Sequence, residues 1–379
     1  MDYVMLKDVC AINMGQSPDS NSYNDNGDGV PFFQGNADFG ERYPITRKWC
    51  TAPTKMAAPN DILISVRAPI GAMNYAKESC CIGRGLAALT PDKSKVSSEF
   101  IFWLMKCKNQ ELNSKGTGST FKAIGRKVLE ETLVPNITLE KQTEYSAILE
   151  RVYAVIQARK TELQKLDELV KARFVELFGD PEDTVTKWDR TNFASVCLDM
   201  HQGINTVADK IEYVNSGFPI IQSKNITSGF LDLEDVRYVK ESDYENYRNK
   251  YNPKPSDLLV CNIGTIGKSL IVEDEVDFLI AWNLFLIKLN KELVNPIFIK
   301  VFIELLNQQN YFEKYMTGGT VKFVNKKTMG NISTPIPPLA LQEKFATFVK
   351  QTDKSKVAVQ KALDEAQLLF DCLMQKYFG

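Results

Sequence analysis

The feature that most constrains the fold is an internal repeat. Residues 117–127 read TGSTFKAIGRK, and residues 317–327, two hundred positions later, read TGGTVKFVNKK. Other features return in the same order, such as the LFG that ends at Gly179 and the YFG that ends at Gly379. A repeat this long predicts one fold duplicated in tandem. With 379 residues, 44% of them hydrophobic, the chain is long enough to give each copy its own core.

The front part of each copy predicts a mixed α/β domain. Short apolar segments such as DILIS (61–65) and DLLVC (257–261) lie between Pro, Gly, Asn and Asp residues, which is typical of strands. One helix-like stretch follows in each copy, from residue 97 and from residue 295. We therefore expect strands and helices in both front parts.

The rear part of each copy predicts a long helix. Residues 139–178 contain no Gly or Pro and carry an apolar stripe at three-four spacing. Forty helical residues extend about 60 Å. A stripe of this length must be covered, and we expect residues 339–378 to cover it as an antiparallel partner. The residues predicted to line this seam are Ile148, Val152, Val155, Leu163, Leu166, Val170, Phe345, Phe348, Val359, Leu363, Phe370 and Leu373.

These elements together predict an α+β protein. Two tandem, pseudo-symmetric mixed α/β domains occupy residues 1–137 and 181–337, and the long helices occupy 138–180 and 338–379. Paired helices would place the two domains at opposite ends of a helical rod. The alternative, in which each helix folds back on its own domain, stays open.

Catalytic chemistry is largely excluded by composition. His201 is the only histidine, so catalytic triads and metal sites with several histidines are ruled out. The segment GTIGKS (264–269) resembles the end of a phosphate-binding loop, but the required glycine is replaced by Asn262. We predict no catalytic residue, no cofactor site and no metal site in this chain.

The cysteines and the apolar runs predict the cellular location of the protein. None of the eight cysteines forms a C-x-x-C pair, and the N-terminus lacks the pattern of a secretory leader. The most apolar run, residues 278–287, is about half the length that spans a bilayer. We expect a reduced, cytoplasmic protein without a membrane span.

The repeated phrase is basic in an otherwise neutral chain. Net charge is −1, yet residues 112–128 and 314–328 contain lysine or arginine and no acid. Cationic side chains, hydroxyls and glycine N–H groups together suit DNA phosphates. The alternative is a loop with solvated lysines. The predicted phosphate-binding residues are Lys115, Thr117, Ser119, Thr120, Lys122, Arg126, Thr317, Thr320, Lys322 and Lys326.

Polar residues that differ between the copies are candidates for reading bases, because two domains that read the same bases would not need to diverge. The alternative for each is an ordinary turn or strand-end residue. The candidates are Gln34, Asn36 and Arg67 in the first copy, and Gln222, Lys224, Asn225, Asn262 and Lys268 in the second.

The ordered duplicate resembles a known family. The sequence runs from a diverged front part through the TGST-F-K phrase and the turn PNITLEKQ (135–142) to the long helix and FVELFGDP (174–181). It then repeats, with the turn PIPPLALQEK (335–344). This arrangement resembles the specificity subunits of type I restriction-modification systems. The resemblance covers the whole chain.

The resemblance implies that DNA recognition and catalysis lie in different subunits. Each front part is expected to be a target recognition domain that reads one half of a split, asymmetric sequence in double-stranded DNA, and the paired helices to be a coiled-coil spacer. Two modification subunits are expected to bind S-adenosylmethionine and methylate adenine, with a restriction subunit as a further potential partner.

Duplex geometry gives an expected separation of the half-sites, and the divergence of the two copies limits how base contacts can be assigned. Half-sites on reachable faces of the duplex would lie about one helical turn, roughly 34 Å, apart. SVRAPIGAM (65–73) and CNIGTIGKS (261–269) differ enough that equivalent base contacts are not implied.

The competing hypothesis is a coiled-coil scaffold that bridges two protein partners without binding DNA.

Overall fold

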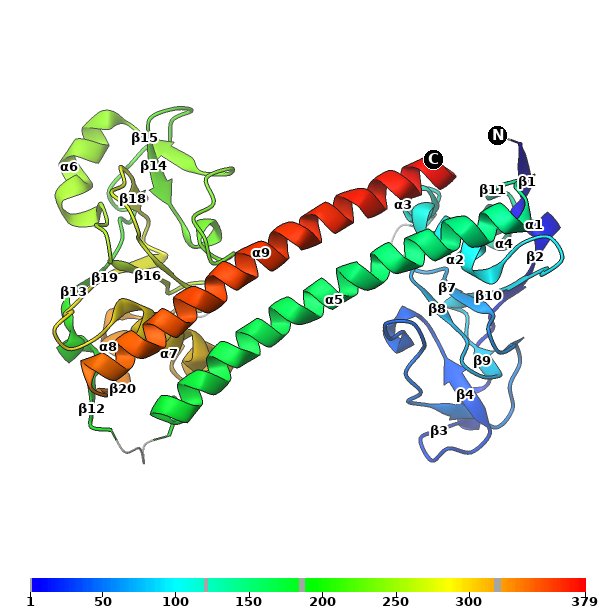
Figure 1. Cartoon of the computed structure of the whole chain (residues 1–379), viewed down its shortest axis with the longest axis horizontal. Coiled ribbons are helices and arrows are strands. Elements are labelled where there is room, and N and C mark those ends of the chain that lie inside the picture. The colour runs from blue at the N-terminus through cyan, green and yellow to red at the C-terminus, as the bar shows by residue number, and fades with distance from the viewer. Residues whose placement is uncertain (1, 119–121, 184–187, 317–321) are drawn as a thin grey trace. The chain divides into compact units, whose positions relative to one another are not determined.

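The computed structural model describes residues 2–118, 122–183, 188–316 and 322–379 (Figure 1). The chain forms two compact units, one of Met1–Lys160 with Gln360–Gly379 and the other of Thr161–Val359. We call residues 2–137 the first head and residues 188–337 the second head. Each unit therefore contains one head and part of both long helices.

The first head is built on two sheets. A four-stranded antiparallel sheet has the order β2-β10-β7-β8, and a second sheet has the order β3-β5-β4-β9-β6, in which β4 and β9 are parallel. The short strand β1 pairs with β11. The strands are β1 (Tyr3–Met5), β2 (Cys10–Met14), β3 (Tyr23–Asn24), β4 (Val30–Phe33), β5 (Trp49–Cys50), β6 (Met56–Ala57), β7 (Ile62–Ser65), β8 (Met73–Tyr75), β9 (Cys80–Ile82), β10 (Leu86–Pro91) and β11 (Leu133–Pro135).

The second head repeats this design. Its four-stranded sheet has the order β13-β19-β16-β17, and the parallel pair β14–β18 corresponds to β4–β9. The strands are β12 (Arg190–Asn192), β13 (Cys197–Gln202), β14 (Phe218–Ile221), β15 (Arg237–Val239), β16 (Leu258–Cys261), β17 (Ser269–Ile271), β18 (Leu279–Ile280), β19 (Leu284–Leu289) and β20 (Ser333–Pro335). The structure thus confirms the predicted duplication of a mixed α/β domain.

The helices of the two heads also correspond. The first head contains α1 (Leu6–Val9), α2 (Ser98–Cys107), α3 (Asn109–Ser114) and α4 (Arg126–Glu130). The second contains α7 (Pro296–Gln308), α8 (Lys326–Gly330) and an added helix, α6 (Glu241–Tyr251). Ser97 caps α2 by accepting a hydrogen bond from the Phe100 N–H, and Asn295 caps α7 by accepting one from the Ile297 N–H.

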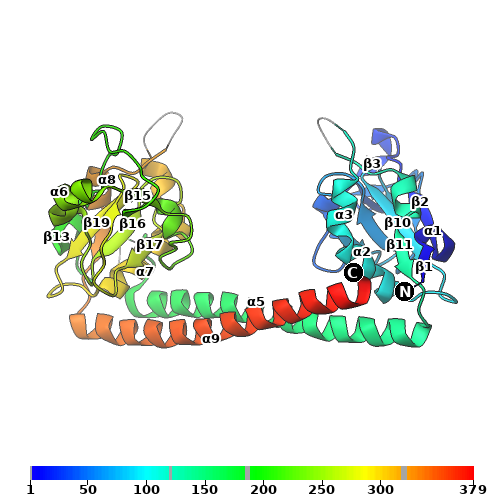
Figure 2. The ribbon, with the colours of Figure 1, turned by 90° about the horizontal axis from the view of Figure 1, so that it is seen from above.

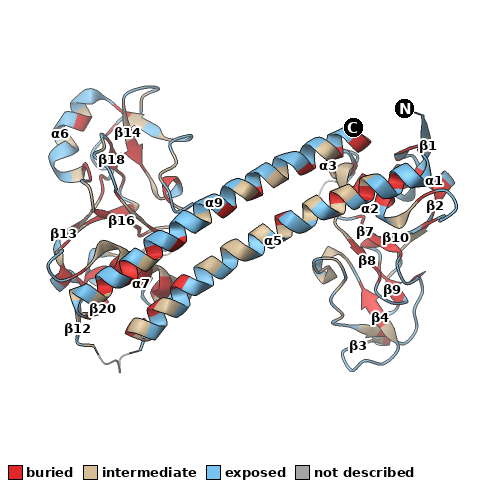
Figure 3. Ribbon diagram, in the orientation of Figure 1, coloured by how far each residue is buried: buried red, intermediate tan, exposed pale blue. Residues whose placement is uncertain are grey.

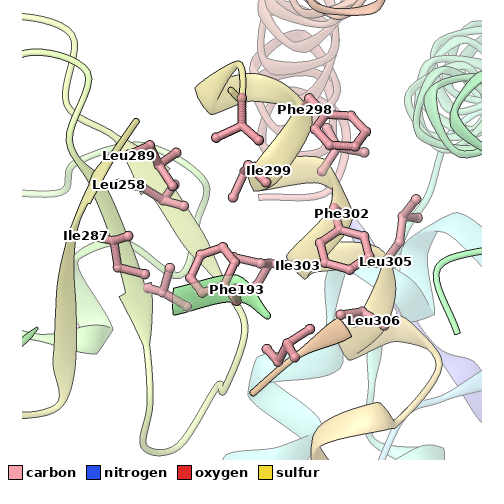
Figure 4. Close-up of a cluster of buried hydrophobic side chains, with 14 of the residues drawn as sticks. Phe193, Leu258, Ile287, Leu289, Phe298, Ile299, Phe302, Ile303, Leu305 and Leu306 are labelled. Carbon is pink, nitrogen blue, oxygen red and sulfur yellow. The ribbon is translucent and has the colours of Figure 1, made fainter. Parts of the chain in front are cut away.

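Helices α2 and α7 connect the sheets to the long helices. In Figure 4, Ile299 and Ile303 of α7 face Phe193, Leu258 and Ile287, which lie on the sheet side of the core. The Phe298 ring, also on α7, lies 5.5 Å from Phe174 and 4.8 Å from Phe178 of the long helix α5, measured between ring centroids. One continuous core therefore joins the second sheet, α7 and the helix pair.

The long helices pair antiparallel within each unit. Both α5 (Leu139–Phe178) and α9 (Leu339–Phe378) have 40 residues. In the first unit the start of α5 and the end of α9 lie side by side (Figure 2). There the Tyr145 ring stacks on Tyr377 at 3.9 Å, and Tyr153 approaches Phe370 at 6.1 Å. In the second unit the Asp167 carboxylate lies 2.7 Å from the Lys356 ammonium. Residue numbers rise along α5 as they fall along α9, which confirms the predicted antiparallel pairing.

Each long helix packs on both heads rather than folding back on its own alone. The start of α5 contacts the first head, where the Trp103 ring lies 5.3 Å from Tyr153, and its end contacts α7 of the second head. Helix α9 does the reverse, because Phe378 at its end lies 5.2 Å from Phe100 of α2.

The seam follows the predicted residues with one correction. Val155 is 47% exposed, and its neighbour Ile156 is buried. A four-residue step from Val152 follows the apolar face at this point, and the predicted three-residue step turns away from it. Of the other predicted residues, Val170, Phe345, Val359, Leu363 and Phe370 are buried, and Ile148, Val152, Leu163, Leu166, Phe348 and Leu373 are partly buried (Figure 3).

Candidate nucleic-acid interface

In the first head, one end of the sheets gathers several of the predicted DNA-binding residues. Three backbone hydrogen bonds link the segments there: Gly85 N–H to Gln34 O at 3.1 Å, Val66 N–H to Gly85 O at 2.9 Å, and Ile124 N–H to Val66 O at 2.9 Å. We call residues 34–36, 66–68, 83–85 and 122–124 the first loop end. It brings together the backbones that carry Gln34, Asn36, Arg67 and Lys122.

The second head forms the same arrangement. The Asn262 N–H donates to Asn283 O at 3.3 Å, and the Val324 N–H donates to Asn262 O at 3.0 Å. We call residues 222–224, 262–264, 281–283 and 322–324 the second loop end. Because these bonds correspond to those of Val66 and Ile124 in the first head, the two loop ends share this part of the backbone framework and differ in side chains.

Lys122 and Lys322, which are equivalent lysines within the repeated phrase, are exposed at the loop ends. Lys122 is held by its backbone, whose carbonyl accepts from Ala68 N–H at 3.0 Å, and its side chain is free to reach outward. Among the described residues, no acidic side chain forms an ion pair with Lys122 or Lys322. Both ammonium groups are therefore available to an anion.

Two other predicted phosphate ligands, Lys115 and Arg126, are engaged within the protein. Lys115 lies 2.6 Å from Glu111, and this hydrogen bond lowers the pKa of the Glu111 carboxyl. The Arg126 guanidinium donates to Ile12 O at 2.8 Å and lies 3.5 Å from Glu130. These two cations are less available to DNA than Lys122.

The remaining residues of the repeated phrase are only partly described. Thr117 exchanges two backbone hydrogen bonds with Ala123, both of 2.9 Å, and its side chain is exposed. Lys326 is exposed at the start of α8. The predicted residues Ser119, Thr120, Thr317 and Thr320 lie outside the described residues.

The predicted base-reading residues separate into exposed and internal groups. Gln34, Arg67 and Lys224 are exposed, and Asn36 and Gln222 are partly exposed. Lys224 forms an ion pair with Asp235, and the hydrogen bond from Lys224 lowers the pKa of that carboxyl. Of this group, only Lys224 has an ion pair to break before it can contact DNA.

Asn225 has a structural role instead. It is 2% exposed, accepts from the Gln222 N–H at 3.0 Å and donates to Asp232 O at 3.0 Å. Its amide holds the loop that carries Gln222 and Lys224, so it supports base-reading candidates without itself reaching a base.

Asn262 is buried at the second loop end without hydrogen bonds from its side chain. It is 1% exposed, and neither amide atom has a partner in the described part of the chain. Nearby, the Asn283 amide donates to Ser223 Oγ at 3.0 Å. The first head has the small or apolar residues Gly85 and Val66 at the two asparagine positions, so polarity beneath the loops differs between the heads.

Lys268 lies in a different place from the other candidates. It lines a groove between α7 and the helix pair, together with Lys171, Lys300 and Lys356. Acids in the groove pair with two of these cations: Glu304 lies 3.1 Å from Lys300, and Asp167 lies 2.7 Å from Lys356. Burial opposes the charged form of Lys356, but its contacts with Asp167 and Asp353 outweigh that effect and raise the pKa of Lys356.

Two exposed residues at the loop ends were missed from the sequence. Arg84 and Trp282 each follow the parallel strand of a head and lie beside the candidates described above. A signal was present in the sequence, since Arg84 stands alone between two glycines in a turn.

His201 contributes to the fold of the second head. Its Nδ1 lies 3.0 Å from the Asp199 carboxylate, its Nε2 lies 2.8 Å from Lys250 O, and its ring meets Tyr251 edge-on. Both ring nitrogens are thus engaged in contacts within the head.

In the part of the chain that the structure describes, no helix carries an apolar stretch long enough to span a bilayer.

One fold is present twice in the chain, and its two copies carry corresponding loop ends with different side chains. The family model of the type I restriction modification DNA specificity domain matches residues 1–168 and 202–366. The chain belongs to this family.

Individual relatives agree with this assignment. The MjaX specificity subunit of Methanocaldococcus jannaschii is 41% identical over 160 residues, which cover 42% of this chain and 38% of that protein. The EcoBI specificity subunit of Escherichia coli is 20% identical over 99% of this chain and 85% of its own length. The crystal structure of a type I system S subunit from M. genitalium is 14% identical, covers 100% of this chain and 96% of its own, and has a TM-score of 0.60, which shows the same fold.

The family membership confirms the resemblance drawn from the sequence. The role of this chain is DNA sequence specificity within a restriction-modification system, and the chain is a non-catalytic subunit. The two family matches also agree with the tandem repeat and its long helices.

Proposed function

We propose that each head reads one half of an asymmetric, bipartite target in double-stranded DNA. The observation that carries the proposal is the pair of equivalent loop ends. They share backbone hydrogen bonds, yet the first displays the exposed Arg67 where the second has the partly buried Ile263. Different side chains on one framework would select different base edges in the major groove.

Contacts with phosphates would orient each head on the duplex. Lys122 and Lys322 occupy equivalent exposed positions beside the candidate base-reading residues. Phosphate contacts supply affinity and register, whereas base contacts supply specificity. The exposed hydroxyl of Thr117 is a further phosphate ligand in this proposal.

The chemistry would be supplied by partners. Modification subunits would bind S-adenosylmethionine and methylate adenine at the site that this chain selects, and a restriction subunit is a further partner. We propose two modification subunits, because the duplication provides two equivalent head and helix surfaces. The cytoplasm, where host DNA and these partners reside, is the proposed location.

The long helices would act as the spacer between the half-sites. Each runs without interruption for 40 residues, or about 60 Å, and takes part in both units. In this proposal the length of the paired helices fixes how many unread base pairs separate the two half-sites.

The proposal is tested on the complex of this chain with its modification subunit. Light scattering after gel filtration gives the stoichiometry, for which two modification subunits per chain are expected. Hydroxyl-radical footprinting on bound DNA is expected to show two protected blocks of unrelated sequence separated by a less protected gap. A stable complex that leaves DNA without sequence-dependent protection would refute the proposal.

A further inference from the structure

A tight turn at each loop end presents one exposed side chain whose chemistry differs sharply between the heads. In the first head the turn comprises Gly83–Leu86, closed by a hydrogen bond from Leu86 N–H to Gly83 O at 3.0 Å. In the second it comprises Ala281–Leu284, closed by Leu284 N–H to Ala281 O at 3.0 Å. Arg84 and Trp282 are the second residues of these turns.

Backbone hydrogen bonds establish that Arg84 and Trp282 are structurally equivalent. The Gly83 N–H donates to Phe33 O at 2.8 Å, and the Ala281 N–H donates to Ile221 O at 2.8 Å. On the far side of each turn, Gly15 N–H donates to Leu86 O and Gly203 N–H donates to Leu284 O. Because the framework on both sides repeats, the two turns present their second residues in the same way.

The turn in the first head is built so that only Arg84 projects from it. Gly83 and Gly85 have no side chains, and a Cβ atom on Gly85 would lie 2.3 Å from the Gln34 carbonyl oxygen. Arg84 is exposed, and its backbone N–H is held by Ser17 Oγ at 3.3 Å. Its guanidinium forms no ion pair or hydrogen bond with another described residue, so all of its donors are open to a ligand.

The turn in the second head presents an aromatic ring from the same position. Trp282 is 43% exposed, which is unusual for so large an apolar side chain in a sheet connection. Its backbone is fixed on both sides, since its N–H donates to Ile204 O at 2.9 Å and its carbonyl accepts from Gln202 Nε2 at 3.2 Å. A rigid backbone with an outward ring indicates a contact surface rather than a loose loop.

The neighbours of both turns point to DNA as the ligand. Gly85 N–H bonds to Gln34 O and Gly85 O accepts from Val66 N–H, which places Arg84 next to two base-reading candidates, Gln34 and Arg67. In the second head, Asn283 follows Trp282 and its carbonyl accepts from Asn262 N–H.

We propose that Arg84 and Trp282 are specificity-determining residues that occupy one position in the two heads and read different bases of the two half-sites. Arg84 would bind a guanine through O6 and N7 in the major groove, the commonest specific contact of arginine. Trp282 would contact the 5-methyl group of a thymine with its apolar ring. This inference rests on the proposed function, because it assumes that the loop ends face DNA bases.

The test maps methylated motifs produced by the complex with the modification subunit, using long-read sequencing of DNA from cells that express it. The variants are Arg84→Ala, Arg84→Lys and Trp282→Ala. The controls are Lys77→Ala and Leu198→Ala, which remove an exposed cation and an exposed apolar side chain at the opposite end of the respective sheets.

The expected results are specific to one base each. Arg84→Ala relaxes one guanine position in one half-site, with discrimination reduced about 10- to 100-fold, and leaves the other half-site unchanged. Arg84→Lys keeps a weaker preference for guanine, and Trp282→Ala relaxes one thymine position in the other half-site. Both controls keep the wild-type motif.

The outcomes separate this inference from the proposed function. If the wild-type complex writes a split motif and both alanine variants write the same motif, the assignment of Arg84 and Trp282 is overturned while the proposed function stands. If the wild-type complex writes no motif, the proposed function itself fails. Gel filtration checks whether each variant still forms the complex. If an alanine variant does not, Arg84→Lys and Trp282→Phe test the assignment through the base preference that they retain at the guanine and thymine positions.

Discussion

Gln142 and Gln342 make the same three hydrogen bonds at equivalent places in the two units. The Gln142 carbonyl accepts from Ser97 N–H at 2.9 Å, and its amide donates to Lys95 O and Ile137 O. The Gln342 carbonyl accepts from Asn295 N–H at 2.8 Å, and its amide donates to Leu293 O and Pro337 O. Each glutamine thus ties the first turn of a long helix to the start of the helix that packs beneath it.

Replacing Gln142 by alanine is expected to reduce the free energy of unfolding by about 2–4 kcal/mol. The side chain is 1% exposed, so its removal takes a partner from the Ser97 N–H and from the carbonyl groups of Lys95 and Ile137, and leaves space in a buried position. Urea denaturation measures the change. The matched control is Gln164→Ala. The exposed Gln164 amide donates to Glu168 on the same helix, so this substitution is expected to cost less than about 0.5 kcal/mol. Equal effects of the two variants would show that the buried glutamine has no special role.

The aromatic cluster where α5 meets α7 is expected to be among the most sensitive parts of the second unit. Phe174 is fully buried and lies 5.5 Å from Phe298 and 5.6 Å from Phe345. Phe174→Ala is expected to cost about 3–5 kcal/mol, because a cavity remains. Its neighbour Val175 is 38% exposed, and Val175→Ala is expected to stay within about 0.5 kcal/mol. Thermal or urea unfolding that fails to separate these variants would contradict the packing described.

Asp257 is expected to make the stability of the second unit depend on pH. Burial raises the pKa of its carboxyl above the ordinary value of 3.8, despite a hydrogen bond from Lys254 N–H. The folded chain therefore binds more protons than the unfolded chain as pH rises from about 3.8 to the raised value, and stability from this group falls across that window.

Asp257→Asn tests this expectation, since asparagine keeps an acceptor for the Lys254 N–H and does not titrate. The variant is expected to gain stability relative to the wild type as pH rises through the window, measured as the difference between their melting temperatures at each pH. A difference that stays constant from pH 3.5 to 7 would rule out the raised pKa as its source.

Reversing the charge of Lys122 or Lys322 is expected to weaken DNA binding by the assembled complex for all sequences alike. Each lost phosphate contact reduces the slope of log affinity against log salt by about 0.9. Lys77→Glu and Lys291→Glu are suitable controls, because both lysines are exposed at the opposite ends of the sheets. If the loop-end variants match these controls in affinity and slope, the phosphate contacts lie elsewhere.

The sequence predicted the architecture well because the architecture is repeated and periodic. Two copies of one phrase imply two copies of one fold, and forty residues without a helix breaker imply a long helix. The seam was less certain: Val155 and Ile156 are both apolar, and only packing against the partner helix decides which of them is buried.

The loop ends were harder to predict because pairing of distant strands creates them. The hydrogen bonds at the first loop end join residues that are far apart in sequence and that meet through the sheets, namely Gln34, Gly85, Val66 and Ile124. The amide of Asn225 could in principle read a base, but this side chain is buried and forms hydrogen bonds within its own loop. Arg84 looks like an ordinary turn residue until the pairing of β4 with β9 and of β7 with β10 places it beside Gln34 and Arg67.

In the proposed function, this single chain recognises both halves of a split DNA target. The most direct measurement is to express the chain with its modification subunit in a host that lacks the system, and to map methylated adenines by long-read sequencing. We expect a split, asymmetric motif that appears only when this chain is present. A stable complex that adds no new methylated motif would contradict it and would favour a scaffold that bridges proteins without reading DNA.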